Sequence, residues 1–152
     1  MLCEAYAEWR FTFLLAEGAA AVVLGRDGRI ALDAIHDGVP FFNRAGASQA
    51  IDRVCGDLAK GGAADLAVGG SNGSFVDLYE KTALNRHFPG IRTFLPKRAL
   101  GEALGAGALI QTVFAALSLE KLKLKSALVT CPGLNHQAGG LRLTLPDAPA
   151  TN

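Results

Sequence analysis

The stretch DLAVGGSNGS at residues 65–74 combines a short apolar strand, over residues 65–68, with a glycine-rich turn. A helix is predicted directly after it, over residues 75–88, with Ser74 as its N-cap and Asp77 in its first turn. A strand that leads through such a turn into a helix is the repeating unit of α/β proteins. This stretch therefore predicts an α/β fold.

The residues on both sides continue the alternation of strands and helices. Apolar residues recur at helical spacing in one segment and form short continuous runs in others, which predicts one more amphipathic helix and several strands. Helix 102–121 is apolar around nearly its whole circumference, so we expect other elements to cover both of its sides. The other predicted elements are helix 47–60, strand 91–95, strand 126–131 and strand 140–145.

An antiparallel pair is predicted near the N-terminus. Asp27-Gly28 separates two apolar runs, and this dipeptide between such runs is a strong hairpin signal. We therefore expect residues 18–24 to pair with residues 29–36, and residues 37–46 to form a loop. The predicted order is β-β-α-β-α-β-α-β-β in a single domain over residues 1–145, followed by a tail over 146–152.

Composition excludes several classes of protein. The 152 residues are 50% hydrophobic and carry a net charge of +1, which argues against disorder and against nucleic-acid binding. No apolar run reaches the ~18 to 20 residues of a membrane span, and acidic residues near the start do not fit a signal peptide. Three cysteines without a CxxC pair argue against disulfides and against a metal site. We expect a cytoplasmic protein.

One short basic run stands out in this nearly neutral chain. In the sequence KLKLK at residues 121–125, three lysines alternate with leucines. We interpret the run as a solvated rim where a helix meets a strand, in preference to a membrane or phosphate patch.

Four stretches of the chain are similar to the motifs of one family. AEGAAAVVL at residues 16–24 is similar to a strand written EGAGALVLE, and DLAVGGSNGS with EKTAL at 80–84 is similar to the segment with a first active-site histidine. PKRALGEALGA at 96–106 is similar to the segment with a second histidine, and CPGL from residue 131 is similar to a closing hairpin. The chain thus resembles the β-ketoacyl-acyl-carrier-protein synthases, which have the thiolase fold.

The resemblance implies half of a thiolase-like fold, with a mixed β-sheet and helices on both faces. A complete member stacks two such halves in five layers, and helix 102–121 would lie in the central layer. We therefore expect a partner, which is either a second copy of the chain or a separate chain that supplies the N-terminal half. An acyl carrier protein is a further partner that the resemblance implies, and no cofactor is expected.

The residues at the family's active-site positions are mostly substituted. In that family a cysteine takes the acyl group and two histidines stabilise the developing charge. Here the first histidine position falls at residues 69–71, which contain no histidine, and Glu102 stands at the second. Lys97 is retained at its place, and we expect it to pair with Glu102. The implied site is Lys97, Glu102 and Ser71 at catalytic positions, with Gly70, Asn72, Gly133, Asn135 and His136 at substrate-binding positions.

The predicted function is therefore that of a ketosynthase-like protein of fatty-acid or polyketide-type biosynthesis. It is either non-catalytic or dependent on a partner, and any activity would be that of a 3-oxoacyl-carrier-protein synthase. An alternative is a serine hydrolase, because GGSNG also fits a nucleophile elbow, with Ser71, Glu102 and His136 as a triad. A third possibility is a truncated product without a function of its own.

Overall fold

The computed structural model describes residues 14–133 and 135–146. They form an α/β fold built on one mixed five-stranded sheet, as predicted. The elements in chain order are β1 (Ala31–Pro40), α2 (Arg44–Ala59), β2 (Leu66–Val68), α3 (Val76–His87), β3 (Arg92–Phe94), α4 (Lys97–Leu100), α5 (Gly107–Leu122), β4 (Ser126–Pro132) and β5 (Gln137–Thr144).

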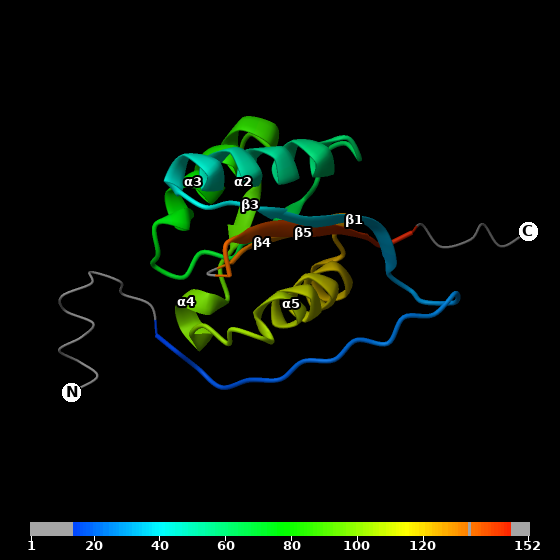
Figure 1. Ribbon diagram of the computed structural model, residues 1–152. Helices are drawn as coiled ribbons and strands as arrows, with labels where there is room; N and C mark the ends of the chain where they lie inside the picture. The colour runs from blue at the N-terminus through cyan, green and yellow to red at the C-terminus, as the bar shows by residue number, and fades with distance from the viewer. Residues whose placement is uncertain (1–13, 134, 147–152) are drawn as a thin grey trace, which may run out of the picture.

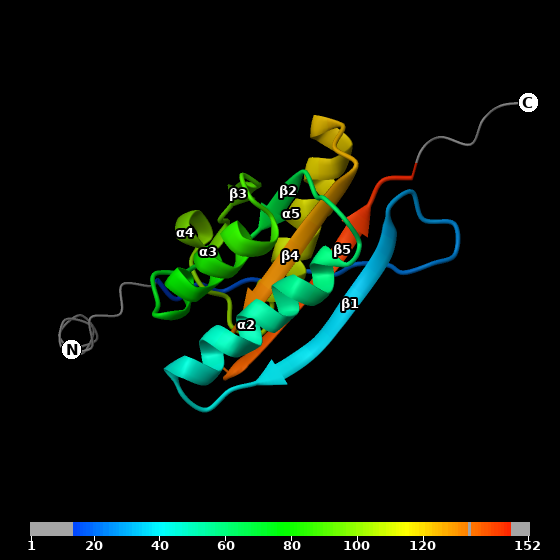
Figure 2. The same ribbon diagram turned by 90° about the horizontal axis from the view of Figure 1, so that it is seen from above.

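The strands lie in the order β1-β5-β4-β2-β3. β2 is parallel to both β3 and β4, whereas β5 is antiparallel to β4 and β1. Helices α2 and α3 cover one face of the sheet, and α5 covers the other (Figure 1; Figure 2). Because β2, β3 and β4 run in the same direction, the loops that follow them meet at one edge of the sheet, where open α/β sheets place their sites.

Each face of the sheet has its own apolar core. On the α2 and α3 side, buried side chains of both helices pack against Ala67 and Leu128. Cys55 belongs to this cluster and is fully buried, as its place on the apolar stripe of the predicted helix indicates. On the α5 side, Ala115 and Leu119 pack against the opposite surface of β2 and β4. The sheet is therefore buried on both sides at its centre, which explains the continuous apolar runs of these strands.

The predicted N-terminal hairpin is wrong. Residues 14–30, here called the strap, cross the face of α5 that lies away from the sheet (Figure 1). Among the described residues of the strap, the only strand-like pairing is a bridge between Leu15 and Glu102. Gly18 lies so close to α5 that an added Cβ would be 3.2 Å from Cδ1 of Ile110. The strap packs on α5 through its small residues, while β1 pairs with β5 alone. Residues 11–13 of the strand-like run lie outside the described residues.

The predicted loop 37–46 is also wrong in part, because β1 continues to Pro40. Asp37-Gly38 does not form a turn, since the register of β1 against β5 shifts between His36 and Val39, and this irregularity takes up the dipeptide. Helix α2 then begins at Arg44, three residues earlier than predicted, because the side chain of Asn43 accepts a hydrogen bond of 2.7 Å from the Gly46 amide.

Helix α5 begins at Gly107, later than the predicted residue 102. The preceding residues form the short α4 and a loop that follows Gly101, whose φ of 87° interrupts the helix. The element order is therefore β-α-β-α-β-α-α-β-β. No helix in the described part of the chain is long and apolar enough to cross a membrane.

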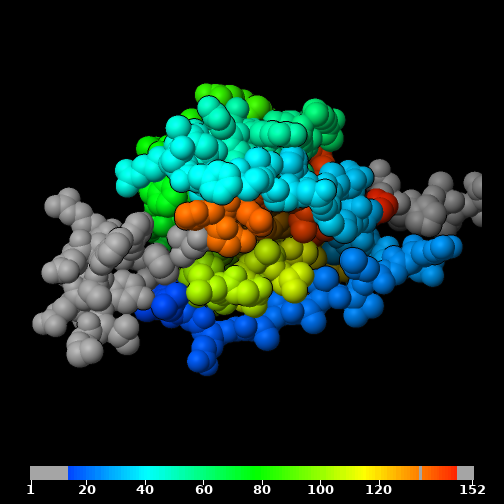
Figure 3. Space-filling view, in the orientation of Figure 1, coloured from blue at the N-terminus to red at the C-terminus, as the bar shows by residue number. Residues whose placement is uncertain are grey.

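Helix α5 is covered fully on its sheet side only. Leu109 and Leu117 are 40% and 43% exposed, and among the described residues the expected cover on the second side is limited to the strap. In the space-filling view the strap runs below α5, which remains visible between the strap and the sheet (Figure 3).

Candidate functional site

The loops after β2 and β4 approach each other very closely at the carboxyl edge of the sheet. An added Cβ on Gly70 would lie 2.8 Å from Cδ of Pro132, and one on Gly69 would lie 2.7 Å from Cδ2 of Leu95. The Gly69 amide also donates a hydrogen bond of 2.9 Å to the carbonyl of Phe94, at the end of β3. At Gly70 the close atoms belong to the rigid ring of Pro132 and to the backbone carbonyl of Thr130, so this position requires glycine, whereas the Leu95 side chain near Gly69 can shift.

The buried carboxylate of Glu80 joins these loops to helix α3. Glu80 of α3 is 1% exposed and accepts hydrogen bonds from the Gly70 amide (2.7 Å), Ser71 Oγ (2.6 Å) and Thr130 Oγ1 (2.6 Å). Burial raises the pKa of Glu80, and the hydrogen bonds from Ser71, Thr130 and Gly70 lower it without cancelling that effect. Glu80 thus holds α3, the turn after β2 and strand β4 in one arrangement.

A second buried network contains the retained lysine. Nζ of Lys97 lies 2.9 Å from Oε2 of Glu102, and Nδ2 of Asn72 donates to the same oxygen at 2.7 Å. The side chains of Lys97 and Glu102 are only 10% and 5% exposed, so the predicted ion pair is confirmed as a buried one. The two opposite charges are paired, and the amide of Asn72 adds a second hydrogen bond to the same carboxylate oxygen. The network positions the turn after β2 against α4.

The cysteine nearest to these networks is not an activated nucleophile. Burial raises the pKa of Cys131 to about 12, although Lys97 lowers it, and the carboxylates of Glu80 and Glu102 add to the rise. The group is therefore a protonated thiol at neutral pH, whereas the nucleophilic form of cysteine is the thiolate. Among the described residues, no group of three His, Cys, Asp or Glu side chains could hold a metal ion.

The remaining predicted binding residues lie in the turn between β4 and β5. The Gly133 amide donates to the carbonyl of Gln137 at 2.8 Å, and Nδ2 of Asn135 lies 3.5 Å from Oε1 of the same residue. His136 has a φ of 60° and stacks on Phe41, with the ring centroids 5.7 Å apart. These contacts stabilise the turn itself.

The structure does not assemble the triad of the hydrolase alternative. Ser71 donates its hydroxyl to Glu80, and Glu102 is occupied by Lys97 and Asn72. Within residues 14–133 and 135–146, no hydrogen bond or ion pair joins His136 to Ser71 or to Glu102.

Several solved structures have a fold similar to that of this chain. The chain superimposes on a chain of AntDE:AntF, a type II PKS acyl-carrier protein in complex with its ketosynthase bound to the hexaketide, with a TM-score of 0.63 at 8% identity. It also superimposes on the ishigamide ketosynthase/chain length factor (TM-score 0.54, 16% identity) and on the PfaC keto synthase-chain length factor (TM-score 0.60, 23% identity). The fold is that of the ketosynthases. The resemblance read from the sequence is confirmed at the level of the fold.

The chain contains only part of that fold. The three superpositions cover 76%, 77% and 86% of this chain but 33%, 36% and 14% of the other chains. The chain thus spans about a third or less of the ketosynthase structures that it matches. No protein-family model matches the sequence, and no curated protein matches it.

Two buried polar residues of this ketosynthase-fold chain were not recognised as site residues from the sequence. Glu80 lies on the same face of α3 as the buried residues Val76, Ala83 and Leu84. Gln111 of α5 is fully buried, and its Nε2 donates to the carbonyls of Thr130 (2.9 Å) and Val68 (3.3 Å). A charged or amide side chain at a position where the helical period requires an apolar one is the signal that would have identified both.

The predicted N-cap of α3 is wrong. The helix begins after Phe75 without a side-chain cap, and the hydroxyl of Ser74 has no hydrogen-bond partner in the described structure. Asp77 fixes the turn instead, because its carboxylate accepts the amides of Asn72 (3.1 Å) and Gly73 (2.9 Å). A carboxylate in the first turn of α3 thus takes the place of the expected serine.

The buried pair makes a prediction about stability. We expect Lys97→Met to lower the free energy of unfolding by about 3 kcal/mol, because it leaves the buried Glu102 carboxylate without its cation. Lys60→Met, which breaks the exposed pair with Asp57, should cost less than about 1 kcal/mol. Urea denaturation measures both, and a double variant Lys97→Met/Glu102→Gln should recover part of the loss. Equal effects of the two lysine substitutions would contradict the structural role of the network.

Glu80 makes a prediction about pH. The folded state holds the proton of this carboxyl more tightly than the unfolded chain, where its pKa has the ordinary value of 4.5. Its contribution to stability is therefore complete below that pH and is lost as the pH rises toward the folded-state pKa. We expect the free energy of unfolding of Glu80→Gln to lack this decline when both proteins are measured from pH 4.5 to 8. Parallel curves for the two proteins would show that Glu80 keeps its ordinary pKa.

Proposed function

We propose that this chain is a ketosynthase-like subunit of polyketide-type or fatty-acid biosynthesis that does not catalyse condensation alone and functions with a partner chain. Its fold supports the proposal, because the solved structures that it matches are ketosynthase and chain length factor proteins. The chain spans about a third or less of those structures, and the proposal assigns the rest of the architecture to a partner.

The side chains in the loops at the carboxyl edge of the sheet, here called the loop edge, support a non-catalytic role for the isolated chain. Condensation needs a thiolate and hydrogen-bond donors that face the developing negative charge. Here Lys97 is neutralised by Glu102, and Glu102 is a carboxylate, which would repel an enolate. The thiol of Cys131 is protonated, and Ser71 donates to a buried carboxylate. The groups at this edge fix the loops in place and leave the acyl chemistry to residues of the partner.

The uncovered side of α5 is the observation that carries the proposal. The strap crosses this side as an extended segment, with Val23 98% and Leu24 74% exposed (Figure 3). Extended backbone with β-branched side chains and without neighbouring strands is a template for pairing with another chain. A sheet that included the strap would lie flat on α5 and bury Leu109 and Leu117 as well. We infer that a second copy of the chain, or a separate chain with the missing half, supplies that sheet.

An acyl carrier protein is the second partner in this proposal. One of the matching structures is a complex of an acyl-carrier protein with its ketosynthase. A subunit of that architecture would contribute part of the surface on which the carrier docks.

Light scattering on the purified chain tests the need for a partner. We expect a discrete dimer, which would identify a second copy as the cover of α5, or aggregation, which would identify a separate chain. Val23→Lys in the strap should shift the dimer toward the monomer or disperse the aggregate, because it places a charge in the buried interface. Leu78→Lys on α3 is the control, since Leu78 is exposed on the other side of the sheet. A stable monomer of the unaltered chain would sink the proposal.

An esterase assay separates the proposal from the hydrolase alternative. We expect Ser71→Ala and His136→Ala each to leave the hydrolysis of p-nitrophenyl esters at the level of the unaltered chain, because no contact joins the two residues. A loss of activity in both variants, with unchanged circular dichroism, would identify a serine hydrolase.

A further inference from the structure

A second apolar surface lies beside α5, at the outer edge of the sheet. A hollow of about 460 Å³ separates β3 from the flank of α5. The rings of Phe94 and Phe114 meet edge to face in it, with their centroids 5.4 Å apart. Leu66, Leu117 and Leu122 complete the apolar lining, and Phe94, Leu117 and Leu122 are all exposed. Neighbouring exposed apolar side chains of this kind mark an interaction site.

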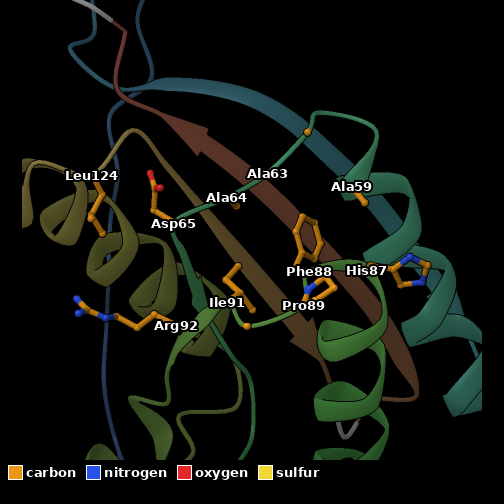
Figure 4. Close-up of a pocket in the computed structure, with 12 residues that line it drawn as sticks. Ala59, Ala63, Ala64, Asp65, His87, Phe88, Pro89, Ile91, Arg92 and Leu124 are labelled. Carbon is orange, nitrogen blue, oxygen red and sulfur yellow. The ribbon is translucent and has the colours of Figure 1, made fainter.

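Two cations stand on opposite walls of this hollow. Arg92 comes from β3 and Lys121 comes from the last turn of α5. Within the described part of the chain, neither has a carboxylate within 4 Å, whereas seven other arginine and lysine residues do. Arg92 also lines a neighbouring pocket together with Asp65 (Figure 4). The charges of the hollow are thus positive and uncompensated.

The edge of the sheet leaves room for an additional element. β3 pairs with β2 on one side only and is an edge strand, and all three of its residues are exposed. Three residues are too few to template a long added strand. The wall contributed by α5 presents Phe114, Leu117 and Lys121, which are spaced as one face of a helix. A helix laid beside α5 would have an apolar ridge facing this wall.

We propose that the hollow between β3 and α5 is a docking site for an acidic amphipathic helix of a partner protein. The apolar stripe of such a helix would cover Phe94, Phe114 and Leu117, and carboxylates on its two flanks would reach Arg92 and Lys121. A fatty acid has a single carboxylate, which would pair with only one of the two cations, Arg92 or Lys121. A second copy of this chain would bring two more cations into the same interface, which is unfavourable.

This docking site lies outside the two buried networks of Glu80 and of Lys97 with Glu102. It shares Leu117 with the uncovered side of α5, while Arg92, Phe94, Phe114 and Lys121 belong to the hollow. Lys123 extends the positive rim beyond α5, since it is the C-cap of the helix. The run that we interpreted as a solvated rim thereby acquires a role in recognising acidic groups.

Binding of a synthetic helix to the full chain tests the inference. The probe is a fluorescein-labelled 21-residue peptide with leucines on one face and glutamates on both flanks, followed by anisotropy. We expect saturable binding that weakens as salt is raised and falls at least tenfold in Arg92→Glu/Lys121→Glu. Lys81→Glu is the matched control, because Lys81 is exposed on α3 and has no carboxylate within 4 Å among the described residues. This control should bind the peptide as the unaltered chain does.

Three outcomes would overturn the inference. One is the absence of saturable binding, and another is equal weakening by the double variant and by Lys81→Glu. The third is displacement of the peptide by sodium dodecanoate at concentrations below its micelle point, which would identify an amphiphile as the occupant. None of these outcomes alters the light-scattering result, so the docking site and the need for a covering chain can fail separately.

Discussion

The packing of α5 on the sheet is the constraint on which the rest of the structure depends. Ala115 and Leu119 are fully buried against β2 and β4, and Gln111 of the same helix binds the carbonyls at the ends of both strands. This contact fixes the edge at which the loops meet. The same helix is apolar on its other side, where the strap is its cover among the described residues. One element therefore organises the described fold on its sheet side and leaves apolar side chains exposed on the other.

Buried polar contacts hold the loops at the carboxyl edge of the sheet. Gly70 allows the close approach of the loops after β2 and β4, and the buried Glu80 ties them to α3. Lys97 and Glu102 form a buried ion pair beside them. A carboxylate at this position stabilises the lysine in the absence of any ligand. The side chains of Ser71, Asn72, Thr130 and Lys97 at this edge thus bond to carboxylates within the chain.

Local sequence patterns correctly predicted the strands and helices that pack against other described elements of the chain. They failed for the strap, which does not pair with the sheet. Apolar runs identified the strands around residues 66–68 and 126–132, and the apolar stripe identified α2, because these segments pack against each other. The ion pair of Lys97 with Glu102 was also predictable from charge and spacing. The strap has the composition of a strand, yet it crosses α5 and pairs with neither edge of the described sheet, so the pattern gave a hairpin that the structure lacks. Glu80 was missed as a site residue because a local pattern does not show which polar groups converge in space.

The exposed apolar side chains of the strap and of α5 determine how large a covering partner must be to bind stably. Full burial of a valine or leucine side chain contributes about 1.5–3 kcal/mol, so Val23, Leu24, Leu109 and Leu117, which are 40–98% exposed, offer only several kcal/mol together. Association costs roughly 4–15 kcal/mol before any contact is made. A short peptide laid on the strap would therefore bind weakly. A sheet that pairs with the strap and extends across α5 adds backbone hydrogen bonds and further apolar area, and it is the kind of partner that these magnitudes favour.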